Sequence, residues 1–221
     1  TRPPATRASP AVTGLNMAGP KLARPLNAPP SPVELTAAVA ADLPIDGRSI
    51  VVFRKALWEP YFPPVNADDR FSGVSLAESF AAEYRERHKN INVGLIPCAH
   101  GGTTIEMWKK GEPLYENAVF AAKLAMKSSE LKGILWHQGE SDCANDRYVH
   151  YKERLRALVR NLRDDLGCGD LPFIAGGLGD YLPKCKIIKD DFENYKEINR
   201  MIKELEHECA PFSFADASGL E

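Results

Sequence analysis

The stretch ILWHQGESDC (residues 134–143) decides how the rest of the chain is interpreted. Three apolar residues, Ile134 to Trp136, are followed directly by six polar or flexible ones, His137 to Asp142. An apolar run of this kind is typical of a buried strand, and the loop at its carboxyl end is where α/β proteins place binding and catalytic groups. The stretch therefore predicts a parallel α/β fold with chemistry at this edge of the sheet.

Strand and helix patterns alternate from Ser49 onward, which favours the same fold. Ser75 and Glu78 have the spacing of a capping box at the start of a helix, and Gly167 has the place of a C-terminal cap. The alternation predicts a mostly parallel sheet with helices on both faces. Strands are expected at 49–54, 91–99, 131–137, 171–179 and from 212, and helices at 75–88, 114–129, 147–167 and 194–209.

The start of the chain has a different composition. Eight of the 17 prolines fall in residues 1–33, and proline neither donates a backbone hydrogen bond nor fits inside a helix. We therefore expect residues 1–48 to form an irregular, proline-rich segment, with a weak helical pattern at 33–43, and residues 49–221 to form the α/β domain.

Composition and charge exclude several classes of protein. The net charge of −2 gives no electrostatic reason to expect a nucleic acid or an anionic membrane as partner. No apolar run approaches the roughly 18 residues of a membrane span, and no signal-peptide pattern is visible. The five cysteines have no metal-binding spacing. We expect a cytoplasmic protein without a metal or cofactor.

Three predicted strands end in loops rich in glycine and polar residues, at 97–108, 137–143 and 176–182. Because the carboxyl ends of parallel strands meet at one edge of a sheet, these loops should converge there. In the first of them, the backbone N–H groups of Gly101 and Gly102 are candidates for binding an oxyanion or a phosphate. A simple turn is the alternative for this glycine pair.

The loop at 137–143 offers the groups that acyl transfer needs. The Gln138 amide is a candidate donor to an oxyanion, Gly139 permits close approach of the backbone, and the Glu140 carboxylate can orient a histidine. The alternative is that Ser141 or Asp142 caps the next helix while Gln138 and Glu140 satisfy backbone groups. From the residues alone, both interpretations stay open.

Several segments together closely resemble one enzyme family. GILWHQGESD, VGLIPCAHGGTTIEMW, FSGVSLAESFAAEY and PFIAGGLGDYL are similar to the carbohydrate-esterase branch of the SGNH hydrolases, the sialate O-acetylesterase and acetylxylan esterase-like family. The resemblance runs from about Ser49 to Leu220. It implies a three-layer α/β/α, flavodoxin-like domain that hydrolyses acetyl esters on sugars without a metal. The implied partner is an acetylated carbohydrate or a small acetyl ester.

The resemblance also implies roles for particular residues. The HQGE motif of the family maps onto residues 137–140, so that His137 and Glu140 are the expected catalytic residues. Gln138 and Gly139 then belong to the oxyanion and substrate-binding set, together with Gly101 and Gly102. In this scheme Gln138 donates to the oxyanion and Glu140 is the acid partner of the catalytic histidine.

The chain departs from the family pattern at two places. The family carries its nucleophile in a GQSNMAG motif, whereas this chain has TGLNMAG at 13–19, so Asn16 matches but Leu15 stands at the serine position. The sequence before Asn16 gives no strand signal, so the first strand is expected to be missing. The chain also stops at Glu221, before the D-x-x-H stretch that carries the family's histidine. We expect hydrolysis to be impaired for these reasons.

Three alternatives to an impaired esterase remain open at this point. One is a catalytically dead protein that still binds acetylated sugars. A second is an esterase with a displaced nucleophile, for which Ser75 and Ser141 are candidates. The third concerns the sequence itself: the resemblance breaks abruptly before Asn16 and after Leu220, which favours a wrong exon junction, a frameshift or a truncated gene model.

Overall fold

The computed structural model describes residues 11–15, 50–66, 75–184 and 192–219. Its strands are β1 (Ala11–Leu15), β2 (Ile50–Arg54), β3 (Leu57–Pro60), β4 (Val93–Pro97), β5 (Leu131–Trp136), β6 (Phe173–Gly176) and β7 (Phe212–Ala215). Its α-helices are α1 (Leu76–Arg87), α2 (Pro113–Ala125), α3 (Tyr151–Leu166) and α4 (Tyr195–Glu204). Short 3-10 helices are η1 (Ile105–Trp108), η2 (Glu140–Asp142), η3 (Asn145–His150), η4 (Leu182–Lys184) and η5 (Leu205–His207).

The strands form a single sheet in the order β3-β2-β4-β1-β5-β6-β7. Neighbouring strands are parallel except β2 and β3, which form an antiparallel hairpin at one edge. The chain leaves β1 toward β2 and β4 on one side and continues to β5 on the other side. This reversal of direction beside β1 is the topological switch point, where open α/β sheets bind their ligands.

The expectation that the first strand is missing is wrong. The short run AVTGL forms β1 and lies in the middle of the sheet, with Ala11 opposite Gly94 of β4 and Leu15 opposite Trp136 of β5. Two neighbouring strands supply hydrogen-bond partners on both sides, and this tertiary context outweighs a weak local signal. The expected irregular segment 1–48 therefore contains a strand. Its other residues, including Asn16 and the weak helical pattern at 33–43, lie outside the described residues.

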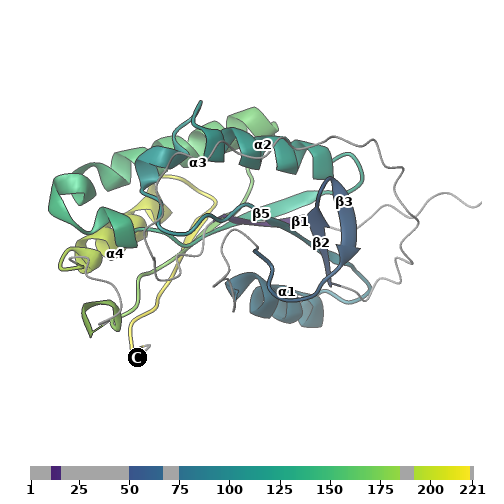
Figure 1. Cartoon of the computed structure of the whole chain (residues 1–221), viewed down its shortest axis with the longest axis horizontal. Coiled ribbons are helices and arrows are strands. Elements are labelled where there is room, and N and C mark those ends of the chain that lie inside the picture. The colour runs from purple at the N-terminus through teal and green to yellow at the C-terminus, as the bar shows by residue number, and fades with distance from the viewer. Residues whose placement is uncertain (1–10, 16–49, 67–74, 185–191, 220–221) are drawn as a thin grey trace, which may run out of the picture.

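Helices cover the two faces of this sheet as expected, and the three-layer α/β/α architecture is confirmed. Figure 1 shows α2 and α3 on one face and α1 on the other. The face under α2, α3 and α4 buries large side chains, among them Ile134, Trp136 and Phe173. The face under α1 buries a smaller cluster that includes Val52 and Leu95.

The local signals for the helix ends are confirmed at Ser75 and Gly167. The Glu78 half of the predicted capping box is not, because the Glu78 carboxylate accepts from the Tyr61 hydroxyl at 2.7 Å instead. Ser75 caps α1, because its side-chain oxygen accepts a hydrogen bond from the Ala77 backbone N–H at 3.1 Å. Gly167 ends α3 with a left-handed backbone at φ +66°, which glycine adopts without strain. The helix expected from residue 147 begins at Tyr151 instead, because η3 precedes it. Phe120 of α2 points away from the core and is half exposed.

A buried arginine ties the end of α3 to the starts of two strands. The Arg163 guanidinium donates to the backbone oxygens of Leu171, Cys209 and Pro211 at 3.0, 2.8 and 2.7 Å. A fourth, longer hydrogen bond of 3.3 Å reaches the oxygen of Ala210. Burial lowers the Arg163 pKa from its ordinary value, but the side chain stays charged, since arginine titrates only at very high pH.

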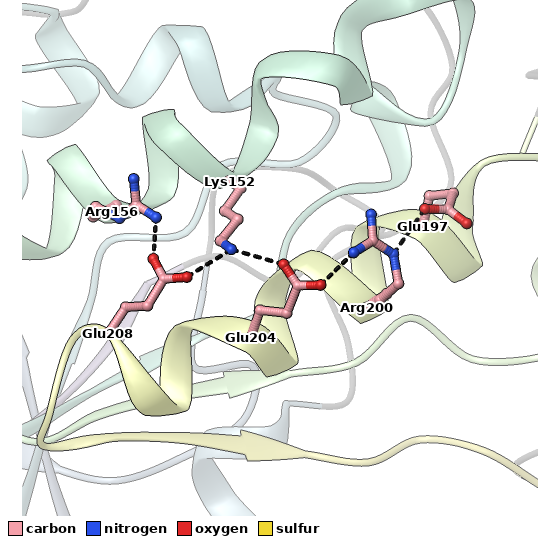
Figure 2. Close-up of polar contacts among 6 residues, drawn as sticks. All are labelled: Lys152, Arg156, Glu197, Arg200, Glu204 and Glu208. Carbon is pink, nitrogen blue, oxygen red and sulfur yellow. Dashed lines mark hydrogen bonds and ion pairs between the residues drawn. The ribbon is translucent and has the colours of Figure 1, made fainter.

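An ionic network joins α3 to α4 and η5 (Figure 2). The Lys152 Nζ lies 2.7 Å from carboxylate oxygens of both Glu204 and Glu208, Arg156 pairs with Glu208, and Arg200 pairs with Glu204. Because most of these side chains are substantially exposed, water and salt screen the pairs and limit their contribution to stability. The six side chains drawn are Lys152, Arg156, Glu197, Arg200, Glu204 and Glu208.

Candidate functional site

The site lies where the carboxyl ends of β4, β1 and β5 meet. Gly14 of β1 is opposite Pro97 of β4 and Leu135 of β5, and Leu15 is opposite Trp136. The loops 98–104 and 137–143 follow β4 and β5 directly. The predicted convergence of these two loops is therefore confirmed, and Leu15 stands between them at the end of the central strand.

His137 and Glu140 face each other across the turn that follows β5. The His137 Nε2 lies 3.6 Å from a Glu140 carboxylate oxygen, and both side chains are mostly buried. The second Glu140 oxygen and the His137 Nδ1 have no hydrogen-bond partner within the described part of the chain. Burial raises the pKa of the Glu140 carboxyl, an effect that the nearby His137 partly offsets. The buried Glu140 carboxyl is therefore easier to protonate than an exposed glutamate.

Gly139 makes this turn possible. Its backbone has φ +146°, a conformation that residues with a Cβ rarely adopt. A Cβ at this position would also lie 3.0 Å from Ile198 and 3.1 Å from Leu178. The strained turn brings Glu140 back toward His137, so the glycine positions the pair.

Gln138, between His137 and Glu140 in the sequence, points into the interior of the protein. It is fully buried, and its amide Nε2 donates to the backbone oxygen of Thr103 at 2.9 Å and to the Asp142 carboxylate at 2.6 Å. Both amide hydrogens are thus used in joining the two loops. The predicted donation from Gln138 to an oxyanion would require one of these bonds to break.

Asp142 completes the link between the loops, which the sequence did not reveal. Its carboxylate also accepts the Ile105 backbone N–H at 2.8 Å, at the start of η1. Burial raises the Asp142 pKa, and these hydrogen bonds oppose the rise. The Tyr151 hydroxyl donates to the backbone oxygen of Gln138 at 2.7 Å from the first turn of α3. The only signal for Asp142 was its place beside the HQGE motif, and Tyr151, farther along the chain at the start of α3, carried no such signal.

The remaining predicted residues lie around the same edge. Gly101 and Gly102 form a turn after β4, and Gly102 has a left-handed backbone at φ +67°. Ser75 is buried as the cap of α1, and Ser141 lies within η2 and is partly exposed. Asn16 lies outside the described residues. No group of three or more metal-binding side chains occurs within the ranges that the structure describes.

Gly176, at the end of β6, packs directly against the imidazole ring of His137. A Cβ built on Gly176 would lie only 2.9 Å from the His137 Nδ1. Gly176→Ala should therefore displace the imidazole and destabilise the fold by about 1–3 kcal/mol, as measured by urea unfolding. Gly169→Ala is the matched control, because a Cβ there meets open space. Equal stability of the two variants would contradict the expected crowding.

The raised pKa of Glu140 predicts how stability depends on pH. A carboxyl whose pKa is higher in the folded state favours folding while it is protonated, and this contribution is lost as pH rises through the raised pKa. Glu140→Gln should remove that loss and make the variant more stable than the parent chain at the upper end of the range. Thermal unfolding at a series of pH values measures the effect.

The control for this prediction is Glu153→Gln, which changes an exposed glutamate on α3. It should keep the pH dependence of the parent chain. Any slope that survives in Glu140→Gln is assigned to Asp142, whose pKa is also raised. If the Glu140→Gln variant loses stability with rising pH as steeply as the parent chain, ionisation of Glu140 does not destabilise the folded state, and the prediction is wrong.

A cavity of about 290 Å³ opens beside His137 on the face of the sheet that carries α1. Its walls come from β4, β5 and β6, from the start of α1, and from residues 65, 66 and 215. Most of the lining groups are apolar, including Leu95, Pro97, Ala99, Leu135 and Ile174. The candidate site therefore combines a buried polar turn with an adjoining apolar pocket.

A three-layer fold with a switch point beside β1, two converging loops and a buried histidine–carboxylate pair is typical of a hydrolase of the α/β class. A family model described as carbohydrate esterase, sialic acid-specific acetylesterase, matches residues 16–221. The chain belongs to this carbohydrate esterase family. Leu15 lies immediately before the matched residues.

Individual relatives agree with this assignment. A probable carbohydrate esterase of Arabidopsis thaliana, At4g34215, is 34% identical over 139 residues, which is 58% of this chain and 54% of that protein. The match thus spans about half of the length of the Arabidopsis protein. The crystal structure of At4g34215 aligns with a TM-score of 0.71 and 25% identity, over 98% of this chain and 88% of that one.

A second solved structure supports the fold. XAC1771, described as a carbohydrate acetylesterase from Xanthomonas citri, aligns with a TM-score of 0.60 over 94% of this chain and 49% of that one. The identity of 17% supports the fold alone.

Within the described ranges, none of the helices has the length and apolar character of a membrane span.

Proposed function

We propose that this chain binds O-acetylated sugars, of the acetylxylan or sialic acid type, at the carboxyl edge of its sheet, and that its hydrolysis of them is impaired. The family assignment supports the substrate class. The observation that carries the impairment is the position of Leu15. It ends the central strand opposite Trp136, between the loops that hold Gly101–Gly102 and His137–Glu140.

The chemistry of acetyl transfer explains why Leu15 matters. In a serine esterase, a hydroxyl oxygen attacks the ester carbon, a base takes the hydroxyl proton, and the alcohol leaves while an acyl-enzyme forms. Water then releases acetate in a second step. A leucine side chain has no atom that can form the acyl bond, so neither step proceeds through this position.

The remaining groups keep roles that the proposed site requires. His137 takes the role of the histidine that the family carries in its D-x-x-H stretch: it accepts and returns a proton, and Glu140 orients its ring and balances its charge. The backbone N–H groups of the Gly101–Gly102 turn are the proposed donors to the oxyanion. Gln138 and Asp142 act as positioning residues, since they join the two loops. With His137 as base, water can attack the ester directly, which gives only a low rate.

An alternative function, sugar binding without any turnover, is favoured by the same leucine. Two measurements distinguish an impaired esterase from a sugar-binding protein. One is acetate release from 4-nitrophenyl acetate and acetylated xylan, and the other is calorimetric binding of an acetylated xylo-oligosaccharide. Weak release that Glu140→Gln abolishes supports an impaired esterase. Binding with no release supports the binding protein. No binding and no release would refute both.

A serine-reactive fluorophosphonate tests the displaced nucleophile in the same preparation. We expect no labelled serine, because Ser75 is engaged as the cap of α1. A label at Ser75 or Ser141, located by mass spectrometry, would show that another hydroxyl has replaced the missing one.

A further inference from the structure

We propose that the cavity beside His137 holds the acyl group of the ester and accepts a linear acyl chain longer than acetyl. This inference rests on the proposed function, because it takes the carboxyl edge of the sheet as the ester-binding site. The proposal concerns the acid part of the substrate, whereas the sugar lies outside the cavity.

The strand order places the cavity across the end of β1. Its walls include Leu95 and Pro97 of β4 and Leu135 of β5, and β1 lies between these two strands. Gly14 is opposite both Pro97 and Leu135. The cavity therefore spans the backbone just before Leu15, the position of the missing nucleophile. An ester carbon held at that position has the cavity directly beside it.

The chemistry of the walls favours a hydrocarbon chain over a sugar ring. His137 is the only titratable side chain among the lining residues that the structure describes. The other polar side chains among these residues are those of Ser75, Ser79 and Asn66, a small part of a mostly apolar wall. The Ser75 oxygen already accepts the Ala77 N–H. A sugar ring buried here would leave many hydroxyl groups without partners, and that costs more than the contacts return. An alkyl chain has no such requirement.

The size of the cavity sets the expected length of the chain. A methyl group, which is all that acetyl contributes beyond its carbonyl, fills little of about 290 Å³. An apolar cavity of roughly 150 Å³ already holds benzene, so this one has room for a chain of about six carbon atoms or more. Each CH₂ group moved from water into such a site should tighten binding roughly fourfold.

Linear methyl ketones test this without any turnover, because they carry the carbonyl group of an ester but cannot be hydrolysed. The complete chain is titrated by calorimetry with acetone, 2-butanone, 2-hexanone and 2-octanone. We expect the affinity to rise roughly fourfold for each added CH₂ group until the cavity is full. An affinity that does not depend on chain length would overturn the proposal.

Matched variants on one helix localise the effect. Ala77 is buried and lines the cavity, whereas Ala82 is exposed on the same helix and is not among the lining residues. Ala77→Leu should weaken binding of 2-octanone on the order of tenfold and leave acetone unaffected, while Ala82→Leu should change neither. If Ala77→Leu does not fold, Leu135→Phe fills the same space. Equal behaviour of the filled and control variants would refute the assignment.

The chain-length inference and the proposed function can be refuted independently of each other. Acetate release by a chain with serine at position 15, without any preference for longer ketones, would leave the esterase site standing and remove only the chain-length inference. Selective ketone binding with no release and no affinity for acetylated sugar would keep the cavity and remove the proposed function.

Discussion

Leu15→Ser is expected to raise the release of acetate from 4-nitrophenyl acetate by about 100-fold or more. Residue 15 ends the central strand and is opposite Trp136, the residue directly before His137. The backbone of residue 15 ends β1 between the strands that lead into the proposed oxyanion turn and into the His137–Glu140 turn. A hydroxyl at this position offers the acyl-accepting oxygen that leucine lacks, so the reaction can pass through two easier steps.

The control for this gain is Leu15→Ala, which removes the leucine side chain without adding a hydroxyl. It should stay at the rate of the parent chain. The double variant Leu15→Ser with Glu140→Gln should not exceed that rate, because the proposed reaction needs the Glu140 carboxylate. A fluorophosphonate should label position 15 in the Leu15→Ser variant and leave it unlabelled in Leu15→Ala. If serine and alanine at position 15 give the same rate, the position is not that of a nucleophile.

Arg163→Ala should lower the free energy of unfolding by about 4 kcal/mol. The guanidinium donates to four backbone oxygens, those of residue 171 and of residues 209–211. Alanine leaves these oxygens with fewer partners in a site that water reaches poorly. Because the oxygens belong to the segments just before β6 and β7, the loss should loosen that edge of the sheet first.

Urea unfolding measures the total loss, and hydrogen exchange of the β6 and β7 amides measures its location. Arg160→Ala is the matched control, because Arg160 lies on the same helix and is exposed. Its effect should stay within about 0.5 kcal/mol. A similar loss in both variants would mean that helix propensity or net charge, and not the carbonyl contacts, determines the result.

Most of the sheet and its helices could be predicted, because their signals are local. Continuous apolar runs marked β4, β5 and β6, and helical periodicity marked α1 to α4. The strand β2 was predicted, but β3 and the hairpin that joins it to β2 were missed for a physical reason. Its turn residues Lys55 and Ala56 both have positive φ, at 48° and 65°, a conformation that usually carries an Asn-Gly signal. Without that signal the segment had the pattern of a loop.

The candidate site could be predicted only in outline. The convergence of the loops followed from the parallel sheet. The motif aligned Leu15 with the family's serine, but its place at the end of a central strand was not predicted, because the sequence before Asn16 gave no strand signal. The partners of Gln138 could not be predicted, since Thr103 lies 35 residues away and binds through a backbone oxygen that every residue possesses. The contact of Gly176 with His137 depends in the same way on how β5 and β6 align.

The central place of β1 has a consequence for how the chain is made. The strands on either side of it, β4 and β5, leave the ribosome about 80 and 120 residues later. At roughly 5–20 residues per second, β1 therefore waits several seconds or longer for its first neighbour. The strands β3, β2 and β4 connect to β5, β6 and β7 only through it. Until it is inserted, the nascent sheet consists of two halves with open edges, and this is the interval in which chaperones should matter most.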